Sequence, residues 1–125
     1  EFTPFPDVPP ALRELRARGL RLVVASNWDC SLPRWLERAG LGALLDGAVS
    51  SAAVGHAKPA PEVFRRALRV AGAAPEEALH VGDSREADLE GARAAGIRGV
   101  LLVRDGFPPA GVETVGSLAE LPALI

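Results

Sequence analysis

Three segments of the chain end alike, with cationic residues, then a glycine, then an apolar residue. Residues 16–20 read Arg-Ala-Arg-Gly-Leu, residues 37–41 read Glu-Arg-Ala-Gly-Leu, and residues 93–97 read Arg-Ala-Ala-Gly-Ile. A cation in a last helical turn, followed by a glycine that can take the left-handed conformation, is typical of a helix end. Residues 70–72, Val-Ala-Gly, are a weaker fourth case. The pattern predicts helices that alternate with the apolar runs between them.

Those apolar runs lack a clean alternation of apolar and polar positions, which is typical of strands covered on both faces. The predicted strands are residues 21–25, 48–50, 78–81 and 99–103. The predicted helices are residues 9–18, 32–39, 61–71 and 85–95, with Pro9, Pro10, Pro33 and Pro61 in first turns, where a missing N–H is harmless.

Strands that alternate with helices over short connections predict an α/β fold with a parallel sheet and right-handed crossovers. We expect a single domain over residues 1–125, in which residues 104–125 form a C-terminal loop and a short helix, 117–124.

Composition excludes several classes of function. The net charge of -2 provides no basic field for nucleic acid and no polybasic anchor for lipid. The longest apolar runs are too short to span a bilayer. A single cysteine, Cys30, excludes an intrachain disulfide and suits a reducing compartment. We therefore expect a cytoplasmic protein that binds neither nucleic acid nor membrane.

Polar residues follow three of the apolar runs. Ser26 and Asn27 follow the first, a loop with Lys58 follows the second, and Asp83 and Asp88 follow the third. Ligands of open parallel sheets bind beyond the carboxyl ends of the strands. A hydroxyl, an amide, an ammonium and two carboxylates at one edge predict a site for a phosphoryl group and a hard divalent cation.

Most of these residues also have a purely structural interpretation. Asp83 could cap a helix, with Glu86 completing a capping box, and Asp88 would be favourable in a first turn through the helix dipole alone. Ser26 and Asn27 could be turn formers.

Lys58 fits a structural interpretation less well. It precedes Pro59-Ala60-Pro61-Glu62 at the positive end of a predicted helix, where a cation is disfavoured. A phosphate or carboxylate to neutralise would explain it, and a solvated surface lysine is the alternative. His56 and His80 are interpreted as structural, and Cys30 as an incidental thiol.

The order and spacing of these residues resemble the haloacid dehalogenase-like superfamily over residues 6–103. Val24-Ala25-Ser26-Asn27 resembles the second motif of that superfamily, residues 58–64 (Lys-Pro-Ala-Pro-Glu-Val-Phe) resemble the third, and Val81-Gly82-Asp83-Ser84 through Asp88 resembles the fourth. The resemblance implies a Rossmann-like parallel sheet sandwiched by helices.

The resemblance also implies roles for the site residues. Ser26 would hydrogen-bond the transferring phosphoryl group, assisted by the backbone N–H of Asn27, and Lys58 would neutralise the attacking aspartate and the phosphoryl oxygens. Asp83 would be a Mg2+ ligand, with Asp88 supporting the metal shell directly or through water. The implied reaction is hydrolysis of a small phosphorylated metabolite through an aspartyl-phosphate.

The first motif of the superfamily, an Asp-x-Asp at the end of a strand, does not occur in the sequence. In the superfamily that strand lies between the strands that here end at Ser26 and Asp83. The chain also contains no methionine. We expect part of a longer product, inactive alone, that lacks the first strand and the cap. The cap is not inserted between the second and third motifs, because residues 51–58 are too few.

Three sources of the central strand are expected: a missing N-terminal segment, a second chain (a homodimer by swapping included), or direct pairing of the two neighbouring strands. Two other functions are retained. A 2-haloacid dehalogenase uses the same nucleophile without metal, but those enzymes usually have serines where this chain has Gly82 and Asp83. A non-catalytic, receiver-like binding module is the second alternative.

Overall fold

Five short parallel strands form two separate sheets in the part of the chain that the computed structural model describes, residues 5–28 and 30–125. β1 (Val23–Ser26) pairs with β2 (Gly47–Ser50), with Ser26 opposite Ser50. β3 (Leu79–Gly82), β4 (Arg98–Leu102) and β5 (Thr114–Val115) form the second sheet in that order. The predicted α/β class with parallel strands is confirmed.

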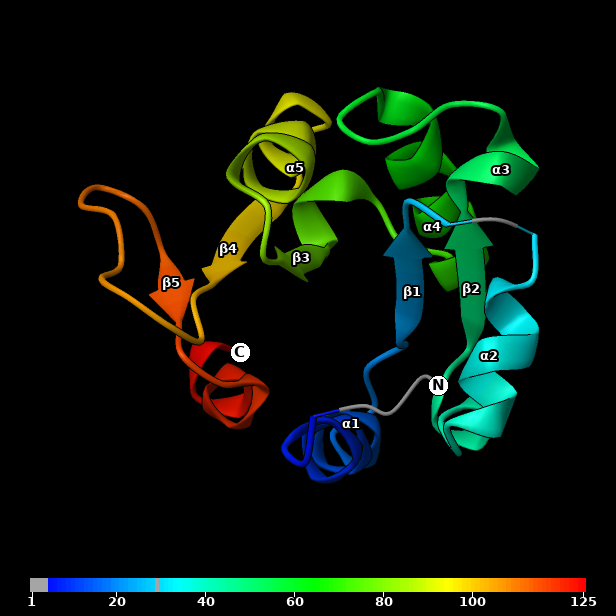
Figure 1. Ribbon diagram of the computed structural model, residues 1–125, viewed down its shortest axis with the longest axis horizontal. Coiled ribbons are helices and arrows are strands. Elements are labelled where there is room, and N and C mark those ends of the chain that lie inside the picture. Colours follow the sequence, from blue (N-terminus) through cyan, green and yellow to red (C-terminus); the bar gives the residue numbers. More distant parts are fainter. Residues whose placement is uncertain (1–4, 29) are drawn as a thin grey trace.

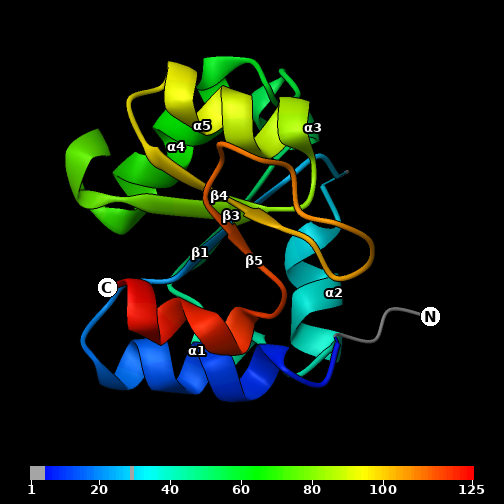
Figure 2. The ribbon, with the colours of Figure 1, turned by 90° about the vertical axis from the view of Figure 1, so that its left-hand side faces the viewer.

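Helices cover both sides of these strands. The α-helices are α1 (Val8–Ala17), α2 (Leu32–Arg38), α3 (Ser51–Val54), α4 (Pro61–Ala71) and α5 (Gly91–Ala94), and the tighter or wider turns are η1 (Gly42–Leu44), η2 (Pro75–Glu77), η3 (Arg85–Glu90) and η4 (Leu118–Leu124). Figure 2 shows α4 and α5 on one side of the strands, and α1 with the red C-terminal η4 on the other. Over the described ranges, no helix is long and apolar enough to cross a membrane.

The helix ends lie where the glycine pattern predicted them. Gly19, Gly40, Gly72 and Gly96 have φ angles of +85°, +77°, +67° and +80°, respectively. A side chain is disfavoured at such angles, so glycine ends each helix without steric cost. The predicted bounds of α4 are those observed.

The predicted helix over residues 85–95 is interrupted. Its first part, η3, is a π-helical turn in which the N–H groups of Asp88 and Leu89 both donate to the Ser84 carbonyl, at 2.9 and 3.2 Å. The N-cap is Ser84, whose hydroxyl accepts from the Ala87 N–H at 3.0 Å. The interpretation of Asp83 as the capping residue is therefore wrong.

Residues 104–125 contain a strand that the prediction of a loop and a helix omitted. β5 forms because β4 has a free outer edge, on which Leu101 and Val103 donate N–H bonds to Glu113 and Val115 at 2.9 and 2.8 Å. A two-residue strand has no periodicity from which to be predicted.

Helix contacts, rather than strand pairing, hold the two sheets together. α4 packs on β1 and β2 and also contacts α5, which packs on β4 (Figure 1). On the other side α1 packs against η4. The buried residues form three clusters: Leu15, Val100, Val115 and Leu121; Leu32, Leu36 and Leu41; and Phe64, Ala92 and Ile97.

β1 and β3 each have one edge that pairs with no strand of the described ranges. β2 occupies the other edge of β1, and β4 the other edge of β3. Figure 1 shows the two groups of strands apart. Direct pairing of the two neighbours, one of the three expected arrangements, is therefore wrong. The two free edges are those predicted for a sheet that lacks its central strand.

Asp7 ties the first helix to the C-terminal part of the chain. Its carboxylate accepts two bonds from Arg104 Nη1, each 3.1 Å, one from the Ser117 hydroxyl and one from the Leu118 N–H, both 2.8 Å. Burial alone would raise the pKa of Asp7, but these hydrogen bonds and the charge of Arg104 lower it to about 2.

Replacing Asp7 with Asn is expected to lower the free energy of unfolding by about 2 kcal/mol at neutral pH, because the charge-assisted bonds are lost. A carboxyl group whose pKa is lowered in the folded state stabilises the fold at pH values above its ordinary pKa. This stabilisation is lost as the pH falls through the lowered pKa. The difference in the free energy of unfolding between variant and parent should therefore shrink as the pH falls from 3.8 through about 2. Urea unfolding across this range measures it, with the exposed Asp105→Asn as control. An equal effect of the two substitutions would contradict the role of Asp7.

Candidate functional site

Lys58 is the only lysine of the chain, whose other cationic side chains are thirteen arginines. It lies in the loop between α3 and α4, and its side chain is only 9% exposed. The ammonium donates to the Ala25 carbonyl of β1 at 3.0 Å and to Asp88 Oδ1 at 2.5 Å. Two of its three N–H donors thus have acceptors among the described residues, and the third remains for another group. The alternative of a solvated surface lysine is wrong.

Asp88 lies in η3 with its side chain 7% exposed, and its carboxylate is bonded on both oxygens. Oδ1 accepts from Lys58 Nζ and from His80 Nε2 at 2.9 Å, and Oδ2 accepts from the Ser84 N–H at 3.1 Å. The carboxylate sits so close to β3 that a Cβ built on Gly82 would lie 2.1 Å from Asp88 Cγ. Glycine at position 82 is therefore a steric requirement of this ion pair.

The environment of Asp88 keeps its carboxylate ionised. Burial alone would raise the pKa, but the hydrogen bond from His80, those from Lys58 and Ser84, and the charge of Lys58 together hold the pKa of Asp88 far below its ordinary value. A buried carboxylate that stays charged is a fixed anionic partner for the Lys58 ammonium.

Asn27 holds the Lys58 loop against the end of β1. Its side-chain oxygen accepts the Lys58 backbone N–H at 2.8 Å, and its amide group donates to the Lys58 carbonyl at 3.3 Å. The sequence predicted a role only for the backbone N–H of Asn27. The side chain of Asn27 also positions the Lys58 loop, because its two hydrogen bonds fix the Lys58 backbone.

Ser26, the last residue of β1, directly follows the carbonyl that Lys58 contacts and is half-buried. Its hydroxyl makes no hydrogen bond within the described ranges. The next segment is anchored to α3, since the Ser51 hydroxyl accepts the Trp28 N–H at 3.1 Å and donates to the Trp28 carbonyl at 3.2 Å. Ser26 therefore ends its strand beside Lys58 with an uncommitted hydroxyl.

Asp83 directly follows β3 and is exposed. In the part of the chain that the structure describes, its carboxylate has neither an ion pair nor a hydrogen bond, so both oxygens are available to a cation. Asp88 differs, because its carboxylate is already committed to Lys58, His80 and Ser84. Among the described residues, no group of three or more His, Cys, Asp and Glu side chains could hold a metal.

Lys58 thus joins the end of β1 to η3, the turn that follows β3, with Asn27 and Asp88 in direct contact with it. The strands β1 and β3 end in the same region. Ser26 and Asp83 are the next residues along these two strand ends. His80, interpreted from the sequence as structural, contacts Asp88, which nothing in the spacing of the two residues indicates, because the strand and the π-helical turn bring them together.

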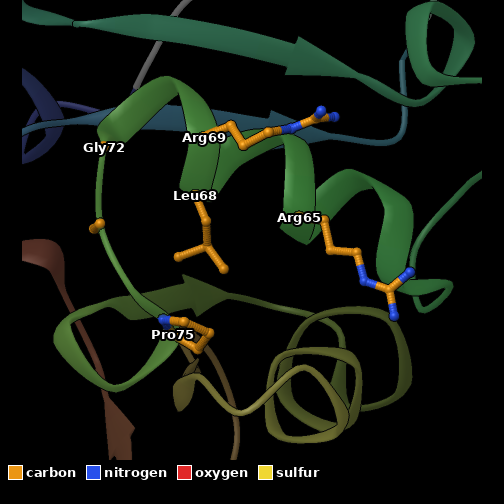
Figure 3. A pocket seen from close by; sticks show the side chains of 6 residues that line it. Arg65, Leu68, Arg69, Gly72 and Pro75 are labelled. Atoms are coloured by element: carbon orange, nitrogen blue, oxygen red, sulfur yellow. The ribbon is translucent and has the colours of Figure 1, made fainter.

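A cavity of about 630 Å³ lies elsewhere, between the last turns of α4 and the segment that leads to η2. Figure 3 shows Leu68 pointing toward Pro75 there, with Arg65 and Arg69 on the same helix. The lining residues are Arg65, Leu68, Arg69, Gly72, Ala73 and Pro75. No predicted site residue lines this cavity, so the candidate site remains at the strand ends.

The family model of the haloacid dehalogenase-like hydrolases matches residues 1–96. The haloacid dehalogenase-like hydrolase domain-containing protein 3 of Homo sapiens is 42% identical in an alignment 123 residues long that covers 90% of this chain and 48% of that protein. A phosphoserine phosphatase of Thermus thermophilus is 41% identical in an alignment of the same length that covers 94% of this chain and 49% of that protein. The chain belongs to the haloacid dehalogenase-like hydrolase family. It spans about half the length of these relatives.

Solved structures give the same fold. A haloacid dehalogenase-like (HAD) phosphatase of Thermococcus onnurineus matches this chain with a TM-score of 0.91 and 29% identity. The match covers 96% of this chain and 57% of the phosphatase chain. A 2-haloacid dehalogenase of Pseudomonas syringae has a TM-score of 0.81 and 30% identity over 96% of this chain and 52% of that one. The α/β Rossmann-like fold is therefore confirmed, and it is shared by phosphatases and dehalogenases.

Replacing Asp88 with Asn should lower the free energy of unfolding by about 3 kcal/mol, because the substitution leaves a buried ammonium without its anionic partner. Chemical denaturation at neutral pH measures this loss. Glu90→Gln is the matched control, since Glu90 follows in the same turn with a side chain 61% exposed and an ion pair of 3.9 Å to Arg85. The control should change stability by less than about 0.5 kcal/mol. Equal stability of the two variants would show that the Lys58–Asp88 pair is not a buried ion pair in solution.

Proposed function

We propose that this chain is the part of a Mg2+-dependent phosphatase that binds and stabilises the transferring phosphoryl group. Its substrate is a small phosphorylated metabolite, and the reaction passes through an aspartyl-phosphate on a residue outside this chain. The observation that carries the proposal is the buried Lys58 ammonium, held by the Ala25 carbonyl and Asp88 with one N–H donor remaining. Phosphoryl transfer depends mainly on positioning and on charge stabilisation, which such a group supplies.

The neighbouring groups complement this ammonium. The hydroxyl of Ser26, which has no hydrogen bond among the described residues, and the backbone N–H of Asn27 are proposed to hydrogen-bond the phosphoryl oxygens. Asp88 acts indirectly in this proposal, because its oxygens already serve Lys58, His80 and Ser84. Position 58 carries a lysine, whereas the other thirteen basic residues of the chain are arginines. Lysine supplies a compact ammonium with three directed donors, and arginine would supply a planar guanidinium instead.

Asp83 is the proposed magnesium ligand of this chain. Its exposed carboxylate, uncommitted within the described ranges, fits a hard cation. Magnesium takes one or two carboxylates and keeps several waters, so one carboxylate from this chain is a fitting share of such a site. When bound, the metal would offset the negative charge of the phosphoryl group.

The nucleophile is proposed to arrive on a strand between β1 and β3, whose facing edges are unpaired in the described ranges. The source is a segment that precedes this chain in a longer protein, or a second chain, a swapped homodimer included. The chain spans about half the length of these relatives, so a longer protein has room for that strand. A cytoplasmic location is proposed from the single cysteine.

The similarity to a solved 2-haloacid dehalogenase favours that activity as the second candidate. Asp83 argues against it, because an exposed carboxylate beside the site would repel a 2-haloacid anion unless a cation bound there. The third candidate is a binding module without catalysis. Magnesium and phosphate together need not stabilise such a module, whereas they should stabilise a phosphatase.

The proposal predicts that this chain alone does not hydrolyse p-nitrophenyl phosphate, and that joining it to the residues encoded upstream gives an activity that EDTA abolishes. In the joined protein, Lys58→Met should lower kcat roughly 100- to 1,000-fold, because a preorganised charge is lost. Lys58→Arg should not restore it, because a guanidinium cannot reproduce the bonds of the ammonium. Asp83→Asn should raise the magnesium concentration required, and Asp105→Asn, an exposed aspartate outside the site, should leave activity unchanged.

The dehalogenase alternative and a nucleophile within this chain have distinct outcomes in the same assays. Chloride release from 2-chloropropionate without magnesium, in the absence of phosphatase activity, would establish the dehalogenase. Magnesium-dependent turnover by the 125-residue chain alone would contradict the external nucleophile.

A further inference from the structure

His80 is a partly buried histidine to which neither the sequence motifs nor the proposed reaction gives a role. It lies on β3 with its side chain 16% exposed, and its Nε2 is 2.9 Å from Asp88 Oδ1. The same oxygen accepts Lys58 Nζ. We infer that His80 is a positioning residue which, through Asp88, holds the Lys58 ammonium in place. The inference rests on the proposed function for its catalytic consequence, but not for the geometry.

The imidazole ring is itself fixed. It packs edge-to-face on Phe64, with ring centroids 5.0 Å apart and an interplanar angle of 87°. Phe64 is 1% exposed and belongs to α4, the helix that follows the Lys58 loop. Because the strand backbone and the Phe64 ring constrain the imidazole from two sides, its Nε2–H is directed at the Asp88 carboxylate.

Removing this donor would loosen the carboxylate. Ser84 holds Oδ2 from the start of η3, while His80 and Lys58 share Oδ1. Without His80, Lys58 would be the only described donor to Oδ1, and the carboxylate could rotate about its Cβ–Cγ bond. The hydrogen bond from His80 is also the foremost factor that lowers the pKa of Asp88 against its burial. A rotated carboxylate would no longer fix the ammonium relative to Ala25.

A merely structural histidine would give a different response to substitution. His80→Phe retains an aromatic ring against Phe64 and removes the donor. His80→Gln removes the ring but offers an amide N–H close to the position of Nε2. A packing role predicts that Phe is tolerated and Gln is harmful; the positioning role predicts the reverse. His56, the other histidine, is exposed, so His56→Gln is the matched control.

The first test is the side-chain NMR signal of Lys58 in the ¹⁵N-labelled chain. As Lys58 is the only lysine, one ammonium resonance is expected, and burial and hydrogen bonding should slow its exchange with water. His80→Phe should broaden this signal beyond detection, while His80→Gln and His56→Gln should retain it. An unchanged signal in His80→Phe would overturn the inference, as would its loss in His80→Gln with retention in His80→Phe.

The second test uses the protein joined to its upstream residues. His80→Phe should lower kcat roughly tenfold, the scale of a lost outer contact to a functional group, with KM unchanged within about twofold. His80→Gln should recover most of the loss. An unaltered kcat in His80→Phe would refute the positioning role. A parent protein without phosphatase activity would instead refute the proposed function, and the lysine signal would still decide whether His80 holds Lys58.

Discussion

The ion pair between Lys58 and Asp88 connects two sheets that share no strand pairing in the described ranges. Taking both charges out of water is costly, so such a pair persists only where further hydrogen bonds satisfy the remaining donors and acceptors. Here the Ala25 carbonyl bonds the ammonium, and His80 and Ser84 bond the carboxylate. The absence of a side chain at position 82 follows from the same arrangement, because a Cβ there would clash with the Asp88 carboxylate.

Helix layers on both sides hold the two sheets, which share no strand pairing in the described ranges. α4 and α5 meet on one side of the strands, and α1 and η4 meet on the other. These layers hold β1 and β3 in place although the two strands do not pair with each other. The free edges of both strands are open to a further strand, and the relatives of the chain are about twice its length. We propose that the chain contributes the groups that stabilise charge and that the nucleophile comes from outside it.

The helix ends and the residues at the strand ends could be predicted, because both depend on local chemistry. A glycine after a cationic last turn ends a helix wherever the helix packs, and Gly72 and Gly96 do so at the expected positions. The position of Lys58 before a helix was unfavourable on electrostatic grounds alone, which indicated a partner. Two features were not predicted. β5 depends on a neighbour, because it forms on the free edge of β4. The cap of η3 is local, but it is Ser84 rather than Asp83.

By itself, the sequence determined the α/β alternation, the helix bounds such as those of α4, and the set of polar residues at the carboxyl ends of the strands. These are consequences of backbone preference and of residues close together in the chain. Only the tertiary structure decided which acidic residue partners Lys58, that His80 contacts the same carboxylate, and that the sheet divides between β1 and β3. The two contacts join residues that are 30 and 8 positions apart, and they depend on how helices bring separate strands together rather than on any local pattern.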